Sequence, residues 1–196
     1  LYILVGKLWT LLVPHGTIAY RVNLLSAFFG VTTVVLVYFA IKRITGTPLA
    51  ALAGAATLAV APAFWQQSSI AGVRTFHTAF VALITLLSIG VLQKWSALEA
   101  LALAIGFSFA HHRMTLLLLP GLTWVIVQSF TPLKKREWPF RRLLGLGALI
   151  LLPQTFYVFT ALRGQWTSLD HFLTFTLATN EVPIVLGKSQ AEIVGQ

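Results

Sequence analysis

The chain has 196 residues, of which 57% are hydrophobic and 10% are charged, and its mean hydropathy is +0.83. Soluble domains carry about 45–50% apolar and about 25% charged residues, so this chain has too few polar side chains to cover a water-facing surface. The composition excludes an ordinary soluble enzyme, a disordered tail and a nucleic-acid-binding arm, and it predicts an integral membrane protein. The net charge of +9 is spread between apolar runs, which is typical of topology signals rather than of a nucleic-acid partner. The chain has no cysteine, which excludes disulfides and thiolate chemistry.

The apolar runs predict an all-α, polytopic transmembrane helical bundle of about six membrane helices. Residues 1–13 are too few to cross a bilayer and predict an interfacial helix, or the end of a truncated element, that stops at Pro14. A crossing needs about 20 apolar residues at 1.5 Å of rise each. Clear spans are predicted over residues 22–41, 48–65, 75–92 and 143–162.

The apolar stretch over residues 97–130 is too long for one crossing, because a helix of that length would measure about 51 Å. The polar triplet His111-His112-Arg113 divides it into a short limb, residues 97–109, and a longer limb, residues 114–130. We therefore expect a hairpin of two antiparallel crossings. This count places eight of the fourteen basic residues on one side, which the positive-inside rule makes cytoplasmic: Lys42, Arg43, Lys94, Lys134, Lys135, Arg136, Arg141 and Arg142.

Two domains are expected. Residues 1–162 form the membrane domain, and the polar residues 163–196 begin an extracytoplasmic segment. Because the chain opens at Leu1 and its single methionine is Met114, we interpret it as an internal part of a longer protein.

Basic and imidazole side chains from several loops meet at the predicted outer ends of the spans. Ionisable groups near membrane depth are costly and tend to face a cavity or a ligand, and these groups share an affinity for anionic oxygen. A lipid phosphate or a polyprenyl-phosphate sugar is the ligand that they predict. The candidate substrate-binding residues are Arg21, Arg74, His77, His111, His112 and Arg113, with Arg163 at the same level.

Simpler roles remain open for some of these residues. Arg21 and Arg163 would equally snorkel to lipid headgroups. The alternative for the His111–Arg113 triplet is a solvated turn, although a segment built only for turning more often contains Gly, Asn or Pro. Arg74 and His77 lie three residues apart and share a helix face.

No carboxylate accompanies the histidines, so the sequence predicts no metal site, supports no divalent metal and indicates no cofactor. Two polar residues early in one span, Asn23 and Ser26, are expected to form hydrogen bonds between helices.

Three segments resemble the bacterial protein O-mannosyltransferase-like membrane family, a group within the GT-C glycosyltransferases. They are AYRVNLLSAFFG over residues 19–30, APAFWQQSSIAGVRTFHTAF over residues 61–80 and FAHHRMTLLLLPGL over residues 109–122. The resemblance implies a GT-C-like bundle in the bacterial inner membrane, with its active site facing outside. It also implies transfer of a sugar such as mannose from a polyprenyl-phosphate carrier to a protein or another acceptor. Membrane lipids are the remaining partners.

The resemblance implies that the six candidate residues belong to the donor site. It also implies that the catalytic acid lies in a loop that would precede Leu1. The catalytic residue itself is therefore unknown here. The family often has an acidic residue where this chain has Gly72, ahead of Val73 and Arg74. A polytopic transporter or lipid flippase is the alternative, although transporters place polar or broken helices near mid-membrane. A scaffold without activity is a further alternative for a chain that lacks the acid.

Overall fold

The computed structural model describes residues 1–93, 98–130 and 140–157, and every regular element within these ranges is helical. The chain divides into two units, Leu1–Gln154 and Thr155–Gln196, and all the helices below belong to the first. Two helices are long and apolar enough to cross a membrane, and a bent pair makes a third; shorter apolar helices accompany them. The predicted all-α membrane bundle is confirmed. The expected domain boundary after Leu162 lies outside the described residues and stays a prediction.

Capping and helix-breaking residues explain where the first two helices begin and end. Helix α1 (Tyr2–Leu12) stops before Pro14, and α2 (Ile18–Thr45) follows it. The Thr17 hydroxyl accepts a hydrogen bond from the Tyr20 N–H at 3.2 Å, which caps the start of α2. At its other end Gly46 takes a left-handed conformation with φ of 71°, and its N–H donates to the Lys42 carbonyl.

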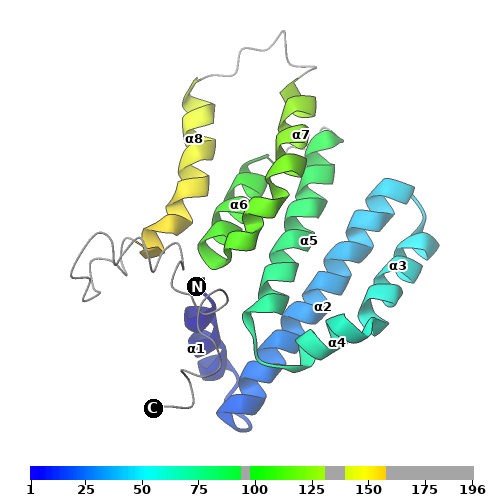
Figure 1. Cartoon of the computed structure of the whole chain (residues 1–196), viewed down its shortest axis with the longest axis vertical. Coiled ribbons are helices and arrows are strands. Elements are labelled where there is room, and N and C mark those ends of the chain that lie inside the picture. Colours follow the sequence, from blue (N-terminus) through cyan, green and yellow to red (C-terminus); the bar gives the residue numbers. More distant parts are fainter. Residues whose placement is uncertain (94–97, 131–139, 158–196) are drawn as a thin grey trace, which may run out of the picture. The chain divides into compact units, whose positions relative to one another are not determined.

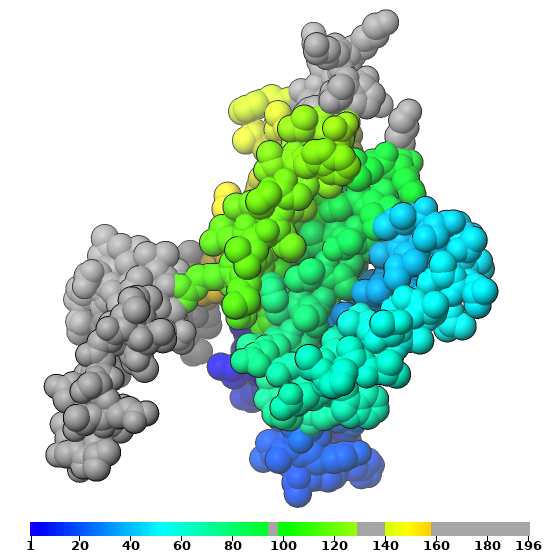
Figure 2. Space-filling model, turned by 45° about the vertical axis from the view of Figure 1, so that its right-hand side comes forward, coloured from blue at the N-terminus to red at the C-terminus, as the bar shows by residue number. Residues whose placement is uncertain are grey.

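The predicted span over residues 48–65 is broken into two helices. Helix α3 (Pro48–Val60) and α4 (Pro62–Ser69) meet at Ala61 with a bend of 63°. Pro62 is the cause, because its ring disfavours a helical conformation at the preceding residue and it has no N–H to donate. In the space-filling view the teal surface of α4 lies between the cyan surface of α3 and the blue N-terminal part of the chain (Figure 2).

Helix α5 (Val73–Leu92) packs along α2 in the same direction (Figure 1). At the start of α5, the Ala71 N–H donates to Asn23 Oδ1 of α2 at 2.8 Å. At its end, Gln93 Nε2 donates to the Arg43 carbonyl at 3.1 Å. Hydrogen bonds at both ends therefore fix α2 and α5 in parallel, and the α3–α4 pair is the return path between them.

The expected hairpin is present. Helix α6 (Leu98–His111) runs back along α5, since His111 at its end reaches the start of α5. The 3-10 helix η1 (Arg113–Leu118) and α7 (Leu119–Phe130) then reverse direction. Helices α5, α6 and α7 all contribute residues to one buried core cluster: Ile84, Leu101, Ala104 and Leu122. The His111–Arg113 triplet lies at the turn, as the sequence predicted.

Helix α8 (Phe140–Leu151) and η3 (Leu152–Gln154) pack on α6 in parallel (Figure 1). Arg142 and Glu99 form a 2.7 Å ion pair where both helices begin. Arg43 and Arg142 lie at this same end of the bundle, in agreement with the sequence prediction that places both on one basic side. Lys94, Lys134, Lys135, Arg136 and the last part of the span expected over residues 143–162 lie outside the described residues. Which side faces the cytoplasm stays a prediction.

The α6–α8 contact is close enough to exclude a methyl group at Gly106. An added Cβ there would lie 2.6 Å from the Ile150 carbonyl oxygen and 2.8 Å from that of Leu149. Because backbone cannot yield as a side chain does, we expect Gly106→Ala to lower the free energy of unfolding by about 1–3 kcal/mol. Thermal unfolding of the full-length protein in detergent measures this. Gly145→Ala in α8, where nothing lies within 4 Å, is the control; equal melting temperatures for the two variants would contradict the prediction.

Candidate functional site

A cavity of about 430 Å³ lies between α4, the first turns of α5 and the joint that links α6 to η1. Its walls carry two imidazoles, a guanidinium, an amide and two hydroxyls on an otherwise apolar background. The lining residues are Ala63, Phe64, Gln67, Arg74, Thr75, His77, Thr78, His112 and Met114. Three of the six candidate residues predicted from sequence thus meet in one cavity.

The loop that leads into α5 is held in place by α2. Asn23 Oδ1 accepts from the Ala71 N–H at 2.8 Å, and Ser26 Oγ accepts from the Gly72 N–H at 3.3 Å. Ser26 is fully buried. The sequence predicted interhelical hydrogen bonds from these two residues, and the structure confirms them, with the backbone of the loop as the partner. They determine where the first turn of α5, and with it Arg74, is placed.

The first turn of α5 has the character of an anion site. Among the described residues no side chain caps the start of this helix, so its first backbone N–H groups have no side-chain partner there, and the helix dipole adds positive potential. Arg74 adds a full charge on the same turn and is exposed. Thr75 is 1% exposed, and its hydroxyl has no hydrogen-bond partner among the described residues. A buried hydroxyl without a partner is costly unless a ligand supplies one.

Two imidazoles complete the polar wall. The rings of His77 and His112 are 4.8 Å apart between centroids. His112 Nδ1 accepts from the Met114 N–H at 3.2 Å, so in the neutral ring the proton is on Nε2, which can donate to a ligand. His77 Nδ1 is buried and has no partner within the described ranges. The wall therefore offers donors to anionic oxygen from both α5 and the α6–η1 joint.

The other three predicted residues lie apart from the cavity lining. His111 Nε2–H donates to the Val73 carbonyl at 3.1 Å, and its ring packs on Phe76 with centroids 4.5 Å apart. Arg113 is exposed at the start of η1. Arg21 donates from Nη1 to the Thr10 carbonyl at 2.7 Å and so ties the end of α1 to α2. His111 and Arg21 hold helices together around the site.

Gln67, Thr75 and Thr78 were not predicted from the sequence. Helix periodicity carries a signal for the two threonines, because they lie within one turn of Arg74 and His77. Gln67 reaches the cavity through the bend at Pro62, which a single straight span over residues 48–65 does not contain.

Gly72, where the resemblance predicts an acid, precedes α5 in an ordinary extended conformation, with φ of −170° and ψ of 160°. A Cβ at this position would meet only the Ile70 carbonyl oxygen, at 3.8 Å. The backbone and the space therefore admit an acidic side chain. In this chain the cavity lining contains basic and neutral polar groups and, among the described residues, no carboxylate.

These features define a multi-helix membrane protein with a cationic, imidazole-lined cavity at one end of the bundle. Residues 1–135 match the family described as the protein O-mannosyl-transferase TMEM260 N-terminal domain, and the chain belongs to this family. It is 28% identical over 211 residues to "Protein O-mannosyl-transferase TMEM260" of Mus musculus, which covers 93% of this chain. The chain spans 29% of the length of that relative. No solved structure matches it.

The hydrogen bond from Ala71 to Asn23 predicts a local effect of substitution. Asn23→Leu keeps the side-chain size but removes the acceptor, so we expect the loop before α5 to open more readily by about 1 kcal/mol. Hydrogen–deuterium exchange of the peptide over residues 66–76 should accelerate about fivefold for the amide of Ala71. Asn23→Asp retains an acceptor oxygen and is the control. Equal exchange in all three proteins would show that α2 does not hold this loop.

Proposed function

We propose that the chain forms part of the membrane region of a protein O-mannosyltransferase that takes mannose from a polyprenyl-phosphate carrier. The observation that carries the proposal is the cavity in which Arg74, His77 and His112 meet the uncapped start of α5. Membership of a family described as a protein O-mannosyl-transferase domain supports the transferase class. The cationic wall supports a phosphate as the group that is bound.

The residues of the cavity would act on the leaving group. In the transfer, the bond between the sugar anomeric carbon and the phosphate oxygen breaks, and an acceptor hydroxyl oxygen bonds to that carbon. The electron pair remains on the phosphate, whose charge grows as the bond breaks. Arg74, the N–H groups of α5 and His112 Nε2–H would stabilise that charge, which lowers the barrier to transfer.

The proton of the acceptor hydroxyl needs a carboxylate, and the described cavity holds none. Glu99 is the one carboxylate in the described residues, and it pairs with Arg142 at the opposite end of the bundle. Asp170 and Glu181 lie outside the described residues. We expect the catalytic acid in a loop that precedes Leu1 in the full-length protein.

The placement in the membrane follows from the same proposal. The paired basic residues at the far ends of α2 and α8 would face the cytoplasm, so the cavity would open on the outer face. The bundle would be of the GT-C type, and a bacterial inner membrane is the expected location.

A transporter or lipid flippase is less well supported. Such proteins place polar or broken elements at the bilayer midplane, and the bent α3–α4 pair is a feature that this chain shares with them. In α2 the charged residues are Arg21, Lys42 and Arg43, and in α5 the charged residue is Arg74, so charges lie near helix ends. The cavity at one rim suits chemistry at a surface better than passage across the membrane.

Arg74 gives the most direct test of donor binding. Hydrogen bonds between charged groups contribute about 1.5–3 kcal/mol, so Arg74→Gln in the full-length protein should raise the KM for the polyprenyl-phosphate donor about 10- to 100-fold. The KM for the protein acceptor should remain unchanged. Arg141→Gln removes an exposed charge at the other end of the bundle and is the matched control. An unchanged donor KM in Arg74→Gln would overturn the proposal.

Thr75 separates function from stability. Thr75→Val keeps the shape and removes the unpartnered buried hydroxyl, so we expect the free energy of unfolding without donor to rise by up to about 1 kcal/mol. We also propose that the donor phosphate accepts a hydrogen bond from this hydroxyl, so the same variant should lose donor affinity. Thermal unfolding with and without donor measures both effects. A variant that is less stable and binds donor normally would assign Thr75 a structural role instead.

A further inference from the structure

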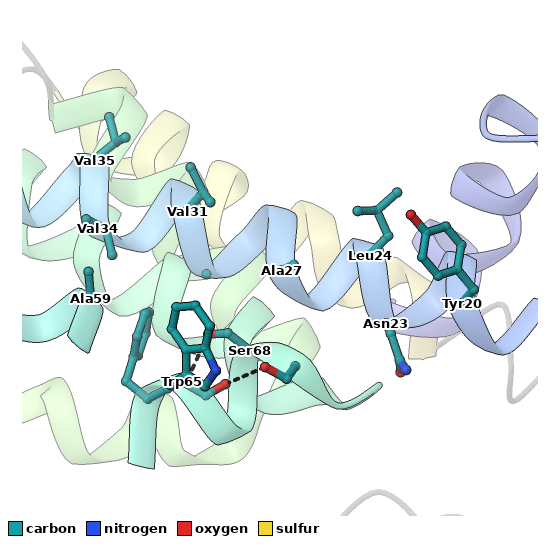
Figure 3. A pocket seen from close by; sticks show the side chains of 13 residues that line it. Tyr20, Asn23, Leu24, Ala27, Val31, Val34, Val35, Ala59, Trp65 and Ser68 are labelled. Atoms are coloured by element: carbon teal, nitrogen blue, oxygen red, sulfur yellow. Dashed lines mark hydrogen bonds between the residues drawn. The ribbon is translucent and has the colours of Figure 1, made fainter. Parts of the chain in front are cut away.

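A second hollow, an apolar groove of about 480 Å³, lies between α2 and the bent α3–α4 pair. Figure 3 shows side chains along α2, from Tyr20 to Val35, with Ala59 of α3 and Trp65 of α4 beside them. The residues between these ends of α2 that line the groove include Ala27, Val31 and Val34. Val31 is 65% exposed, so the groove is open to the surroundings of the bundle.

Three polar side chains of the groove are already bonded within the protein. Ser68 Oγ donates to the Phe64 carbonyl, and Ser69 Oγ donates to the Trp65 carbonyl, both at 2.9 Å. Asn23 Oδ1 accepts from the Ala71 N–H. Apart from Tyr20 and Trp65, which each bring one further polar atom, the groove therefore presents a hydrocarbon surface and offers little to a polar ligand.

The groove adjoins the cationic cavity. Phe64 lines both, and α4 separates them: Trp65 and Ser68 line the groove, while Gln67 lines the cavity. From Tyr20 to Val35 the groove extends along about 22 Å of α2, a large part of a hydrocarbon core of about 30 Å. An apolar groove of this length that ends beside a cationic pocket is complementary to an amphiphile with one anionic head and one long chain.

We infer that this groove holds the isoprenoid chain of the lipid carrier while the carrier phosphate lies in the cavity beyond α4. The inference rests on the proposed function and adds a second binding element to it, on α2 and α4. Phosphate recognition and chain recognition are then separate, and each can be disturbed without the other.

The test compares two donors in the full-length protein, a long-chain polyprenyl-phosphate mannose and a short-chain analogue with the same head. Val31→Trp places an indole in the groove from an exposed position, so the core of the bundle is not repacked. The part of the chain that the indole displaces passes into lipid hydrocarbon, so the loss is of packing contacts in the groove and not of burial from water, and we expect the KM for the long-chain donor to rise about three- to tenfold. The KM for the short-chain donor should be unchanged. Val60→Trp is the matched control, because Val60 is 74% exposed on α3 and does not line the groove.

The outcomes separate the two proposals. A rise in KM that is confined to the long-chain donor and to Val31→Trp supports the groove. Normal transfer from both donors by Val31→Trp, with no change in either KM, overturns the groove and leaves the proposed function intact. The absence of transfer from either donor by the unmodified protein overturns the proposed function and the groove with it.

Discussion

The position of the site depends on how α2 holds the start of α5. Asn23 and Ser26 accept hydrogen bonds from two consecutive backbone N–H groups, those of Ala71 and Gly72. These groups precede a helix that no side chain caps. Two side chains on α2 therefore fix where α5 begins, and the cavity, the placement of Arg74 and the approach of the α6–η1 joint all follow from that position.

The break between α3 and α4 is the second constraint, and it gives the bundle two distinct hollows. A straight helix over residues 48–65 would cover the side of α2 with small apolar residues. The turn at Pro62 instead carries Phe64 and Gln67 across the start of α5, which closes the cavity on one side and leaves the groove on the other. Gly30 permits this packing, since a Cβ there would lie 2.6 Å from Ser68 Oγ.

Much of the architecture could be predicted from the sequence, because a membrane restricts the backbone to a few solutions. Apolar length located the helices, and the polar triplet His111–Arg113 located the hairpin turn. Pro62 was visible as a helix breaker near the end of a span, yet its bend of 63° depends on packing against α2.

The site was harder to predict than the fold. Charge alone grouped Arg21 with Arg74 and His112, although Arg21 turns back to the Thr10 carbonyl. A search by charge also could not find Thr75, which is notable because its hydroxyl is buried and has no hydrogen-bond partner among the described residues. The direction of each side chain decides whether its polar group faces a cavity or joins two helices. A single sequence does not contain that information.

Under the proposed function, the charge of Arg74 in the cavity has a consequence for turnover. A phosphate that carries a sugar is a diester with one negative charge, whereas the carrier left after transfer is a monoester with a charge of about −1.5 to −2 near neutral pH. Arg74, with no carboxylate in the described cavity lining, would retain the spent carrier more tightly than the loaded one. Product release would then limit the rate, and competition by free carrier phosphate would measure the difference.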